Sequence, residues 1–281
     1  MTDYLDREPW DPARPDVVAA FDELPLWSAM AGLVLLEHLP LVRGARVLDV
    51  GCGTGFPLLE LAQRLGRPAT VHGLDRWAVA LQRARFKAGV TGVANSTLTR
   101  GDGAAMPFRE AQFDLVVSNL GINNFADPDA VFRESRRVLR RGGRLALTTN
   151  VEGHMAELYA VFEAVLAERG RAGPLEALRR HVAYRGTATS IAERLGNAEF
   201  RLARAVERNF PMRFADGSAL FRHYFIRLGF LDGWRGVVAG EEEREVFAAL
   251  EDGLNRRAAE RGELALTVPL TYVEAEAVEP A

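Results

Sequence analysis

One segment near residue 50 restricts the fold more than any other. The apolar run at residues 47–50 leads into Gly51-Cys52-Gly53-Thr54-Gly55, and leucines then recur at helical spacing from Leu58. The run predicts a buried strand and the recurrence predicts a helix. Glycines are required between them, because the backbone must turn sharply and approach a ligand more closely than a Cβ allows. The segment therefore predicts a strand–turn–helix unit at one edge of a sheet.

The same alternation of strand and helix continues to residue 150. Short apolar runs predict further strands, and helical stretches at 77–88 and 130–139 separate some of them; the runs lie at residues 70–74, 96–100, 113–118 and 144–149. Strands that alternate with helices of this length form βαβ units. We expect an α/β protein with a Rossmann-like, doubly wound and mostly parallel sheet.

The second half of the chain is less regular. Helical spacing predicts helices at 155–169, 175–182 and 190–195. Apolar residues at even positions in 202–214 and 264–272 predict two half-buried strands. Pro269 predicts a bulge or a late start in the second of them, because proline cannot donate to a central ladder.

Acidic residues lie at the ends of the first three predicted strands. Asp49 ends the first, Asp75 ends the second, and Asp102 follows the third within Gly101-Asp102-Gly103. Open α/β sheets bind ligands at the carboxyl ends of their strands, and a carboxylate in the position of Asp75 binds ribose hydroxyls. Asp102 suits an adenine amino group. The alternative for each is a tight turn with a solvated aspartate.

The glycine turn departs from the dinucleotide-binding pattern. Its spacing is G-x-G-x-G, and Phe56 stands where that pattern requires Gly or Ala. Both features count against a nicotinamide-dependent oxidoreductase, which remains one alternative function. A protein that binds its cofactor without turnover is another.

Five ordered segments together resemble class I S-adenosylmethionine-dependent methyltransferases, in particular the small-molecule group that includes the ubiquinone and menaquinone methyltransferases. The resemblance covers about residues 45–150; its segments are Val47–Gly55, Gly73–Asp75, Gly101–Phe108, Phe113–Asn119 and Leu139–Leu145. It implies an enzyme that transfers a methyl group from S-adenosyl-L-methionine to a small molecule. It also implies that the 264–272 strand is antiparallel and lies between the fifth and sixth strands.

The resemblance assigns roles to individual residues. Gly51, Gly53 and Gly55 would cradle the methionine part of the cofactor, with Asp49 toward its amino group. The remaining cofactor contacts would be Asp75 on the ribose, Asp102 and Gly103 on the adenine, Arg76 or Trp77 over the adenine ring, and Ser118 and Asn119 beside the transferred methyl group.

The acceptor side is less defined by the sequence. His154 follows the fifth predicted strand and is the first candidate for a general base; the alternative is a histidine at a helix N-terminus without a ligand. His223 is the second candidate, and Asn119 completes the candidate catalytic residues. Asn123 and Asn124 are either ligand contacts or caps of the next helix. The acceptor, the atom methylated and the need for a base stay open.

We expect four parts: a helical cap at 1–43, a cofactor-binding core at 44–150, a helical lid or acceptor region at 151–200, and a C-terminal part at 201–281 that completes the sheet. Aromatic and apolar residues in the predicted cover favour a partly apolar acceptor, although they also suit a packed core; they are Trp10, Trp27, Met30, Phe162, Phe221, Phe225 and Trp234.

Composition excludes several other classes. The net charge of −3 over 281 residues gives no basic footprint for nucleic acid or anionic membrane. Cys52 is the only cysteine, so neither a disulfide framework nor a cysteine metal site is expected, and Lys87 is the only lysine for Schiff-base chemistry. No signal peptide or membrane span is predicted. We expect a cytoplasmic monomer or homodimer that binds no metal.

Overall fold

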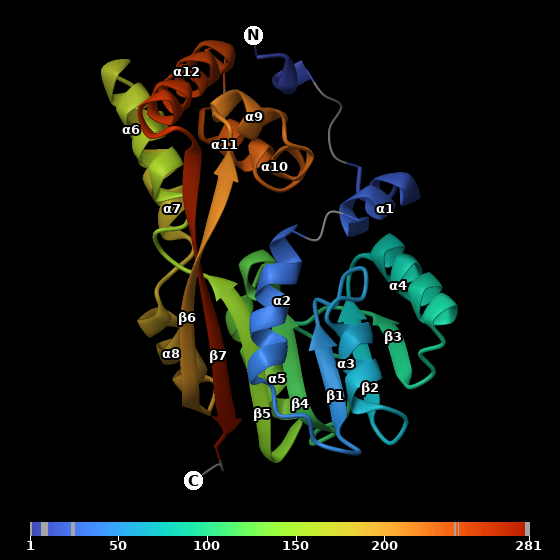
Figure 1. Cartoon of the computed structure of the whole chain (residues 1–281). Helices are drawn as coiled ribbons and strands as arrows, with labels where there is room; N and C mark the ends of the chain where they lie inside the picture. Colours follow the sequence, from blue (N-terminus) through green and yellow to red (C-terminus); the bar gives the residue numbers. More distant parts are fainter. Residues whose placement is uncertain (1, 7–10, 24–25, 239, 241, 279–281) are drawn as a thin grey trace. The chain divides into compact units, whose positions relative to one another are not determined.

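The computed structural model describes residues 2–6, 11–23, 26–238, 240 and 242–278, so Trp10 lies outside the described residues. Its centre is a sheet with the strand order β3-β2-β1-β4-β5-β7-β6 (Figure 1). The strands are β1 (Arg46–Val50), β2 (Thr70–Asp75), β3 (Ser96–Arg100), β4 (Phe113–Asn119), β5 (Leu139–Asn150), β6 (Phe200–Phe214) and β7 (Leu264–Ala277).

Pairing directions confirm the predicted fold class. Strand β1 pairs in parallel with β2 and β4, β2 pairs in parallel with β3, and β4 pairs in parallel with β5. Strand β7 pairs antiparallel with β5 and lies between β5 and β6, where the resemblance placed it. Because β1 to β5 are parallel, their carboxyl ends meet at one edge, called here the carboxyl edge.

Helices connect and cover the strands. Among the described residues, the helices before β5 are η1 (Asp3–Asp6), α1 (Pro15–Glu23), α2 (Leu26–His38), α3 (Leu58–Leu65), α4 (Ala78–Thr91), η2 (Gly121–Asn124) and α5 (Pro128–Val138). Those after it are α6 (Ala156–Glu168), α7 (Ala172–Ala183), α8 (Ala188–Asn197), α9 (Gly217–Arg222), α10 (Tyr224–Gly229), α11 (Leu231–Val238) and α12 (Glu243–Arg261).

Local chemistry explains where the core helices begin. Helix α3 buries its leucines at the predicted helical spacing, including Leu58, Leu61 and Leu65. The side chain of Asp127 caps α5 by accepting from the amide of Ala130 at 2.9 Å, and Pro128 occupies the first turn. Asn123 and Asn124 therefore do not cap α5.

Two expectations about the strands are wrong. Strand β5 begins at Leu139 rather than after Gly143, because the pairing of Leu139 with Phe113 extends the ladder through a bulge. Strand β7 runs through Pro269 without a break. Its ladder with β5 begins at Leu270, so the amide that proline lacks is not needed in that ladder.

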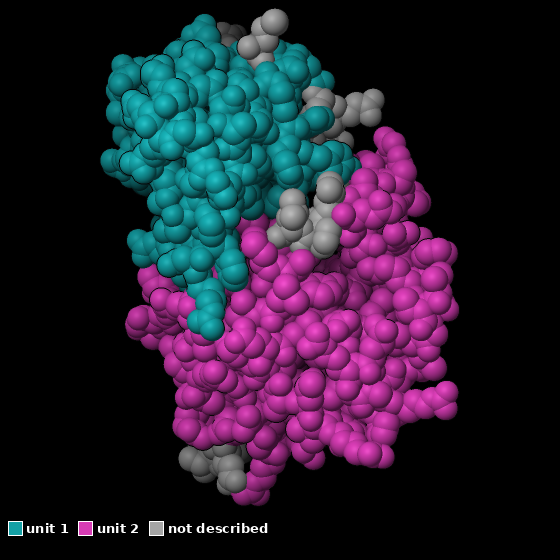
Figure 2. All heavy atoms as spheres, in the orientation of Figure 1, with its two compact units in different colours: residues 1–10, 151–186, 208–269 teal, residues 11–150, 187–207, 270–281 magenta. Residues whose placement is uncertain are grey.

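The chain forms two compact units, each built from segments that are distant in sequence. Unit 1 contains residues 1–10, 151–186 and 208–269, and unit 2 contains residues 11–150, 187–207 and 270–281 (Figure 2). Unit 2 holds the parallel strands β1 to β5 entirely. The terminal segment 3–6 is grouped with helices more than 200 residues later, which no local sequence pattern indicates.

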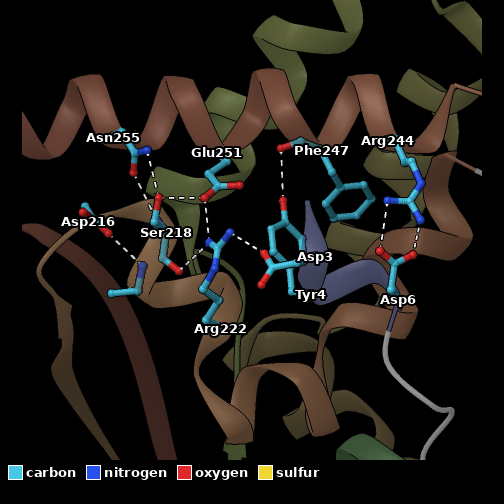
Figure 3. A network of polar contacts seen from close by, with 11 residues as sticks. Asp3, Tyr4, Asp6, Asp216, Ser218, Arg222, Arg244, Phe247, Glu251 and Asn255 are labelled. Carbon is cyan, nitrogen blue, oxygen red and sulfur yellow. Dashed lines mark hydrogen bonds and ion pairs between the residues drawn. The ribbon is translucent and has the colours of Figure 1, made fainter. Parts of the chain in front are cut away.

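A polar network joins segments of unit 1 that are distant in sequence (Figure 3). Glu251 of α12 accepts hydrogen bonds from Ser218 at 2.6 Å and from Arg222 at 2.7 Å. Arg222 also pairs with Asp3 at 2.6 Å, and the Tyr4 hydroxyl donates to the carbonyl of Phe247 at 3.3 Å. The network explains why the N-terminal segment belongs to this unit.

The aromatic residues expected to cover the acceptor mostly form the core of unit 1. Phe162, Phe221 and Trp234 are fully buried. The Phe221 ring lies 6.1 Å from that of Trp234, and Tyr4 stacks on Phe221 at 4.9 Å. These rings are packing residues, so the preference for an apolar acceptor gains no support from them.

The described helices contain no single span that is long and apolar enough to cross a membrane. The bent pair formed by residues 15–23 and 27–38 meets the length and hydropathy criteria only when taken together.

Candidate functional site: the carboxyl edge of unit 2

The glycine turn after β1 has the geometry that its sequence predicts. Gly53 has φ +48° and Gly55 has φ +101°, a region that side-chain-bearing residues rarely adopt. A Cβ added to Gly55 would press on Ala84 and Leu59, whereas one added to Gly53 would meet nothing within 4 Å. Gly55 is thus required for packing, and Gly53 leaves open space at the turn. Gly51 anchors the turn by donating to the carbonyl of Leu74 at 2.8 Å.

Asp49 is a buried carboxyl group without hydrogen-bond or ion-pair partners that would offset the cost of its burial. Its side chain is 0% exposed, and neither oxygen makes a well-formed hydrogen bond with any described residue. Burial raises the pKa of Asp49 to about 8; the nearby Asp75 adds to the rise and the amide of Leu58 offsets part of it. A buried acid in this condition lacks a partner that a cationic ligand group would provide.

Asp75 braces the glycine turn. Its carboxylate accepts from the amide of Gly53 at 2.8 Å and from the amide of Trp77 at 2.8 Å. A carboxylate has about four lone-pair sites, so two remain for ligand hydroxyls. The sequence predicted Asp75 as a ribose ligand but did not indicate that it also fixes the turn.

Asp102 and its neighbours form a more exposed part of the edge. One oxygen of Asp102 accepts from the amide of Ala104 at 2.9 Å, and the other lies 3.7 Å from the exposed Arg76 guanidinium. Gly103 is buried, and a Cβ there would lie 3.0 Å from Val50. The absence of a side chain at Gly103 lets this loop approach the end of β1.

Ser118 and Asn119 lie at the end of β4, and their side chains are committed to the fold. Ser118 donates to the carbonyl of Val50 at 2.7 Å. Asn119 donates to the carbonyl of Ser28 at 2.9 Å and accepts from Thr148 at 2.8 Å. Asn119 therefore brings the start of α2 to the carboxyl edge. The placement of Asn119 beside the transferred methyl group stays a prediction.

Amide and hydroxyl side chains continue this edge beyond Asn119. Asn123 accepts from the Thr149 hydroxyl at 2.6 Å and donates to the Asn150 side chain at 3.4 Å. Asn124 donates to the carbonyl of Leu120 at 3.4 Å. The sequence suggested Asn123 as a ligand contact or a helix cap. Its hydrogen-bond partners on β5 depend on the register of β4 and β5, which the sequence does not give.

The two candidate bases belong to unit 1, whereas the cofactor candidates belong to unit 2. His154 is 2% exposed, its ring lies 5.7 Å from that of Phe230, and burial lowers its pKa to about 2, with Arg185 and His181 adding to the fall. His223 joins α9 to α10, packs edge-on against Phe214, and has its pKa lowered by burial. Their role as bases stays a prediction.

Sequence reasoning missed the N-terminal contacts of the turn. Trp77 donates from Nε1 to the carbonyl of Pro12 at 2.7 Å, so it holds the chain that precedes α1. A Cβ on Gly32 of α2 would overlap the ring of Phe56, which shows that this ring packs against the α2 backbone. Phe56, which departs from the dinucleotide pattern, therefore packs the glycine turn against α2.

A groove of about 760 Å³ lies elsewhere in unit 2. Its cationic lining is Arg133, Arg136, Arg137 and Arg141, close to Leu139 at the start of β5. The start of β5 is at the amino edge of the sheet, so this groove is separate from the glycine turn.

The residues at the carboxyl edge fit S-adenosyl-L-methionine. The uncompensated Asp49 suits the ammonium group of its methionine part, the open space at Gly53 accepts a close approach, and Asp75 has acceptor sites for ribose hydroxyls. The fold and the residues of this site are those of the class I S-adenosylmethionine-dependent methyltransferases, whose cofactor is S-adenosyl-L-methionine.

Comparison with known proteins gives the family. A family model described as a methyltransferase domain matches residues 41–182, half of the chain, and the chain belongs to this family. A demethylmenaquinone methyltransferase from Lactiplantibacillus plantarum is 38% identical over 111 residues, which cover 39% of this chain and about half (47%) of that protein.

Two further matches extend over more of the chain. The nocamycin O-methyltransferase from Saccharothrix syringae is 29% identical over 243 residues, covering 82% of this chain and 84% of that protein. The solved structure of a SAM-dependent methyltransferase from Aquifex aeolicus has a TM-score of 0.57 at 16% identity and covers 96% of this chain and 100% of that one. This structural match shows the shared fold.

Proposed function

We propose that the protein transfers the methyl group of S-adenosyl-L-methionine to an oxygen atom of a small, partly apolar molecule. The choice of an oxygen acceptor rests on the match to an O-methyltransferase over 82% of the chain. This match necessarily includes residues outside the family domain at 41–182. The match to a demethylmenaquinone methyltransferase covers only 39% of the chain and so informs less about the acceptor.

The proposed cofactor contacts are those of the carboxyl edge. Asp49 would pair with the ammonium group, Asp75 would accept from the ribose hydroxyls, and Asp102 with Gly103 would hold the adenine. Bound S-adenosyl-L-methionine supplies a methyl group activated by a sulfonium. In this proposal Arg76 flanks the adenine, and Ser118 and Asn119 support the floor of the site at the end of β4.

The acceptor is proposed to lie along β4 and β5, near the start of α2. The side chains bonded to one another there are amides and hydroxyls, namely Asn119, Asn123, Thr148 and Thr149. Neutral donors of this kind suit an acceptor whose oxygen ionises readily, such as an enol or a carboxylic acid, because such an oxygen needs little help from a base. The half-buried Trp27 and Met30 of α2 support a partly apolar acceptor.

The remaining expectations belong to the same proposal. They are the four-part division with an acceptor region at 151–200, a cytoplasmic monomer or homodimer, and an acceptor that is not a nucleic acid. The formal net charge of −3 supports the last of these.

The test is methyl transfer from ¹³C-methyl-labelled cofactor to a panel of carboxylic acids, enols, phenols, amines, thiols and quinols. We expect signal on oxygen-linked methyl groups only, and none with Gly53→Val. Transfer to nitrogen, sulfur or carbon would overturn the oxygen acceptor. Tight cofactor binding without transfer to any acceptor class would favour a non-catalytic cofactor-binding protein instead.

A further inference from the structure

We propose that the cationic groove of unit 2 binds the phosphate group of a small hydroxylated molecule, at a site separate from the glycine turn. The groove has a volume of about 760 Å³, and its lining residues all belong to unit 2. It lies at the amino edge of the sheet, opposite the carboxyl edge that holds the candidate cofactor residues. The proposed ligand is therefore neither the cofactor nor the methyl acceptor.

Three segments of the chain form the groove. They are the turn at 110–111 before β4, the stretch 133–141 that runs from α5 into β5, and the turn at 197–199 between α8 and β6. The second segment contributes four arginines, namely Arg133, Arg136, Arg137 and Arg141. The other two segments contribute Glu110 and Glu199. Four arginines against two glutamates leave the lining with an excess of positive charge.

The spacing of the arginines on α5 is not explained by the helix itself. Residues 133, 136 and 137 are three and four positions apart, so they lie on neighbouring turns of one helix face, where like charges repel one another. The helix dipole favours cations in the last turn, which accounts for Arg136 and Arg137. It does not account for Arg133, which lies a turn earlier, or for Arg141, which lies beyond the helix.

One of the four arginines is committed to the fold. Nε and Nη2 of Arg137 donate to the two carboxylate oxygens of Glu134 at 2.6 and 2.7 Å, and Nη1 donates to the carbonyl of Phe108 at 2.8 Å. The charge of Arg137 is thus neutralised within the protein, and its side chain is held in place as part of the groove wall.

Arg133 and Arg136 have positive charge left for a ligand. Arg133 is exposed and makes no hydrogen bond or ion pair with a residue that the structure describes. Arg136 donates from Nη2 to the carbonyl of Val278, which is a neutral acceptor. The carboxylate of Glu199 lies 3.8 Å from Nε of Arg136, beyond hydrogen-bond distance, and its side chain is mostly exposed. An anion in the groove would give both guanidinium groups the counter-charge that they lack.

The backbone of two lining residues adopts a conformation that costs free energy. Ala111 has φ +50° and Glu199 has φ +60°, in the left-handed region that residues with a Cβ rarely adopt. The amide of Ala111 donates to the carbonyl of Arg137 at 3.0 Å, and the carbonyl of Glu199 accepts from the amide of Val278 at 2.9 Å. These hydrogen bonds fix both rims, so the groove is formed before a ligand binds. Backbone strain of this kind is concentrated at binding sites.

The chemistry of the lining favours a phosphorylated polyol. Guanidinium groups bind phosphate through paired N–H donors, and a phosphate monoester presents three acceptor oxygens to more than one arginine. Glu110, Asn197 and Glu199 are exposed and offer acceptors to hydroxyl groups. The described lining contains no aromatic side chain that could stack on a nucleobase. A sugar phosphate therefore fits these groups better than a nucleotide.

The experiment titrates the full chain with glucose 6-phosphate, ribose 5-phosphate and glycerol 3-phosphate by calorimetry at low salt. We expect saturable binding of at least one of them at one site per chain, and no binding of glucose. Arg133→Gln and Arg136→Gln should each weaken the affinity by about 10–100-fold, since each removes charge-assisted hydrogen bonds. Arg180→Gln, which removes an exposed arginine paired with Glu176 in unit 1, is the control and should change nothing.

The absence of saturable binding for all three phosphates would overturn the proposal, and so would equal losses in Arg133→Gln and Arg180→Gln. Tighter binding of a single-stranded oligonucleotide or of a phosphoserine peptide would also overturn it, because the ligand would then be a macromolecule. Arg133→Gln changes an exposed residue and still gives the test if Arg136→Gln does not fold.

Titration with S-adenosylhomocysteine separates this site from the cofactor site. Its affinity should be the same in Arg133→Gln and in the wild type, and a parallel loss in the variant would contradict a separate site. The absence of S-adenosylhomocysteine binding by the wild type would instead contradict the cofactor site and leave the phosphate site intact.

Discussion

Two buried carboxylates in this molecule have opposite surroundings. Glu251 in unit 1 is 6% exposed and is bonded to Ser218 and Arg222, whereas Asp49 in unit 2 is 0% exposed and has no well-formed hydrogen bond among the described residues. The free energy cost of burying a charge is offset in the first case and not in the second. A buried acid with hydrogen-bond partners indicates a structural role. A buried acid without them indicates a binding site for a ligand.

The largest expected effect is the loss of cofactor binding in Gly53→Val. The new side chain has open space in the protein but would occupy the space that the ligand needs. We expect calorimetry to show a loss of more than about 100-fold, or more than about 2.7 kcal/mol. Gly92→Val is the matched control, since Gly92 also has a positive φ and open surroundings at the end of α4. Equal affinities in the two variants would remove the steric argument.

Asp49→Asn is expected to stabilise the cofactor-free protein by a few kcal/mol at neutral pH. The folded pKa of Asp49, about 8, exceeds its ordinary value of 3.8, so the folded state binds the proton more tightly. The contribution to stability is therefore complete below pH 4 and is lost as the pH rises towards 8. Denaturant unfolding at pH 5 and pH 8 should show this loss in the wild type and not in Asp49→Asn.

The exposed Asp129→Asn is the control for that experiment, because Asp129 is half exposed and pairs only loosely with Arg194. The comparison with Glu251 fails if Asp49→Asn destabilises the cofactor-free protein to the same extent at both pH values. The same variant should weaken cofactor binding, since it removes the carboxylate that is proposed to pair with the ammonium group.

Arg222→Met tests the compensated acid. Removing the guanidinium leaves Glu251 with Ser218 alone, and we expect a destabilisation of about 1–3 kcal/mol, less than for a fully buried pair because Arg222 is partly exposed. Cofactor affinity should not change. Arg213→Met, at an exposed pair with Glu263, should leave stability essentially unchanged. A large fall in cofactor affinity in Arg222→Met would erase the distinction between the two regions.

The smallest expected effect on turnover belongs to His154→Gln. His154 is buried and neutral, and its lowered pKa means that its contribution to stability is present above pH 6.5 and is lost as the pH falls toward 2. We expect a modest loss of stability at pH 8 and turnover per folded molecule within a few-fold. Single-turnover methyl transfer is the measurement, and a fall of about 10²–10⁴ would establish the general base that the sequence suggested.

The geometry of the candidate cofactor side was predictable because its determinants are local. The glycine spacing and the strand-end acids Asp49, Asp75 and Asp102 lie within 54 residues of one another, and parallel pairing brings strand ends together. The contacts of Asp22 with Arg83 and of Asn119 with Ser28 were not predictable, since they depend on where α1 and α2 pack. The start of β5 was also missed, because a bulge extends its ladder beyond the apolar run.

Unit 1 was the least predictable region for the same physical reason. Its core joins Tyr4 to Phe221 and Phe247, and its polar network joins Asp3 to Arg222, across more than 200 residues. Apolar aromatic residues in the sequence suited both a ligand pocket and a core. Only their mutual packing, with Phe162 and Trp234 fully buried, distinguishes the two.

We propose above all that the carboxyl edge of unit 2 binds S-adenosyl-L-methionine through the acids at the strand ends. The most direct test is calorimetric titration of wild type and Asp75→Ala with S-adenosylhomocysteine. Asp75 offers acceptors to the ribose and also fixes Gly53, so we predict saturable binding by the wild type and a loss of about 1.5–3 kcal/mol, or roughly 10–150-fold, in the variant. Unchanged affinity in a folded Asp75→Ala protein would contradict the claim.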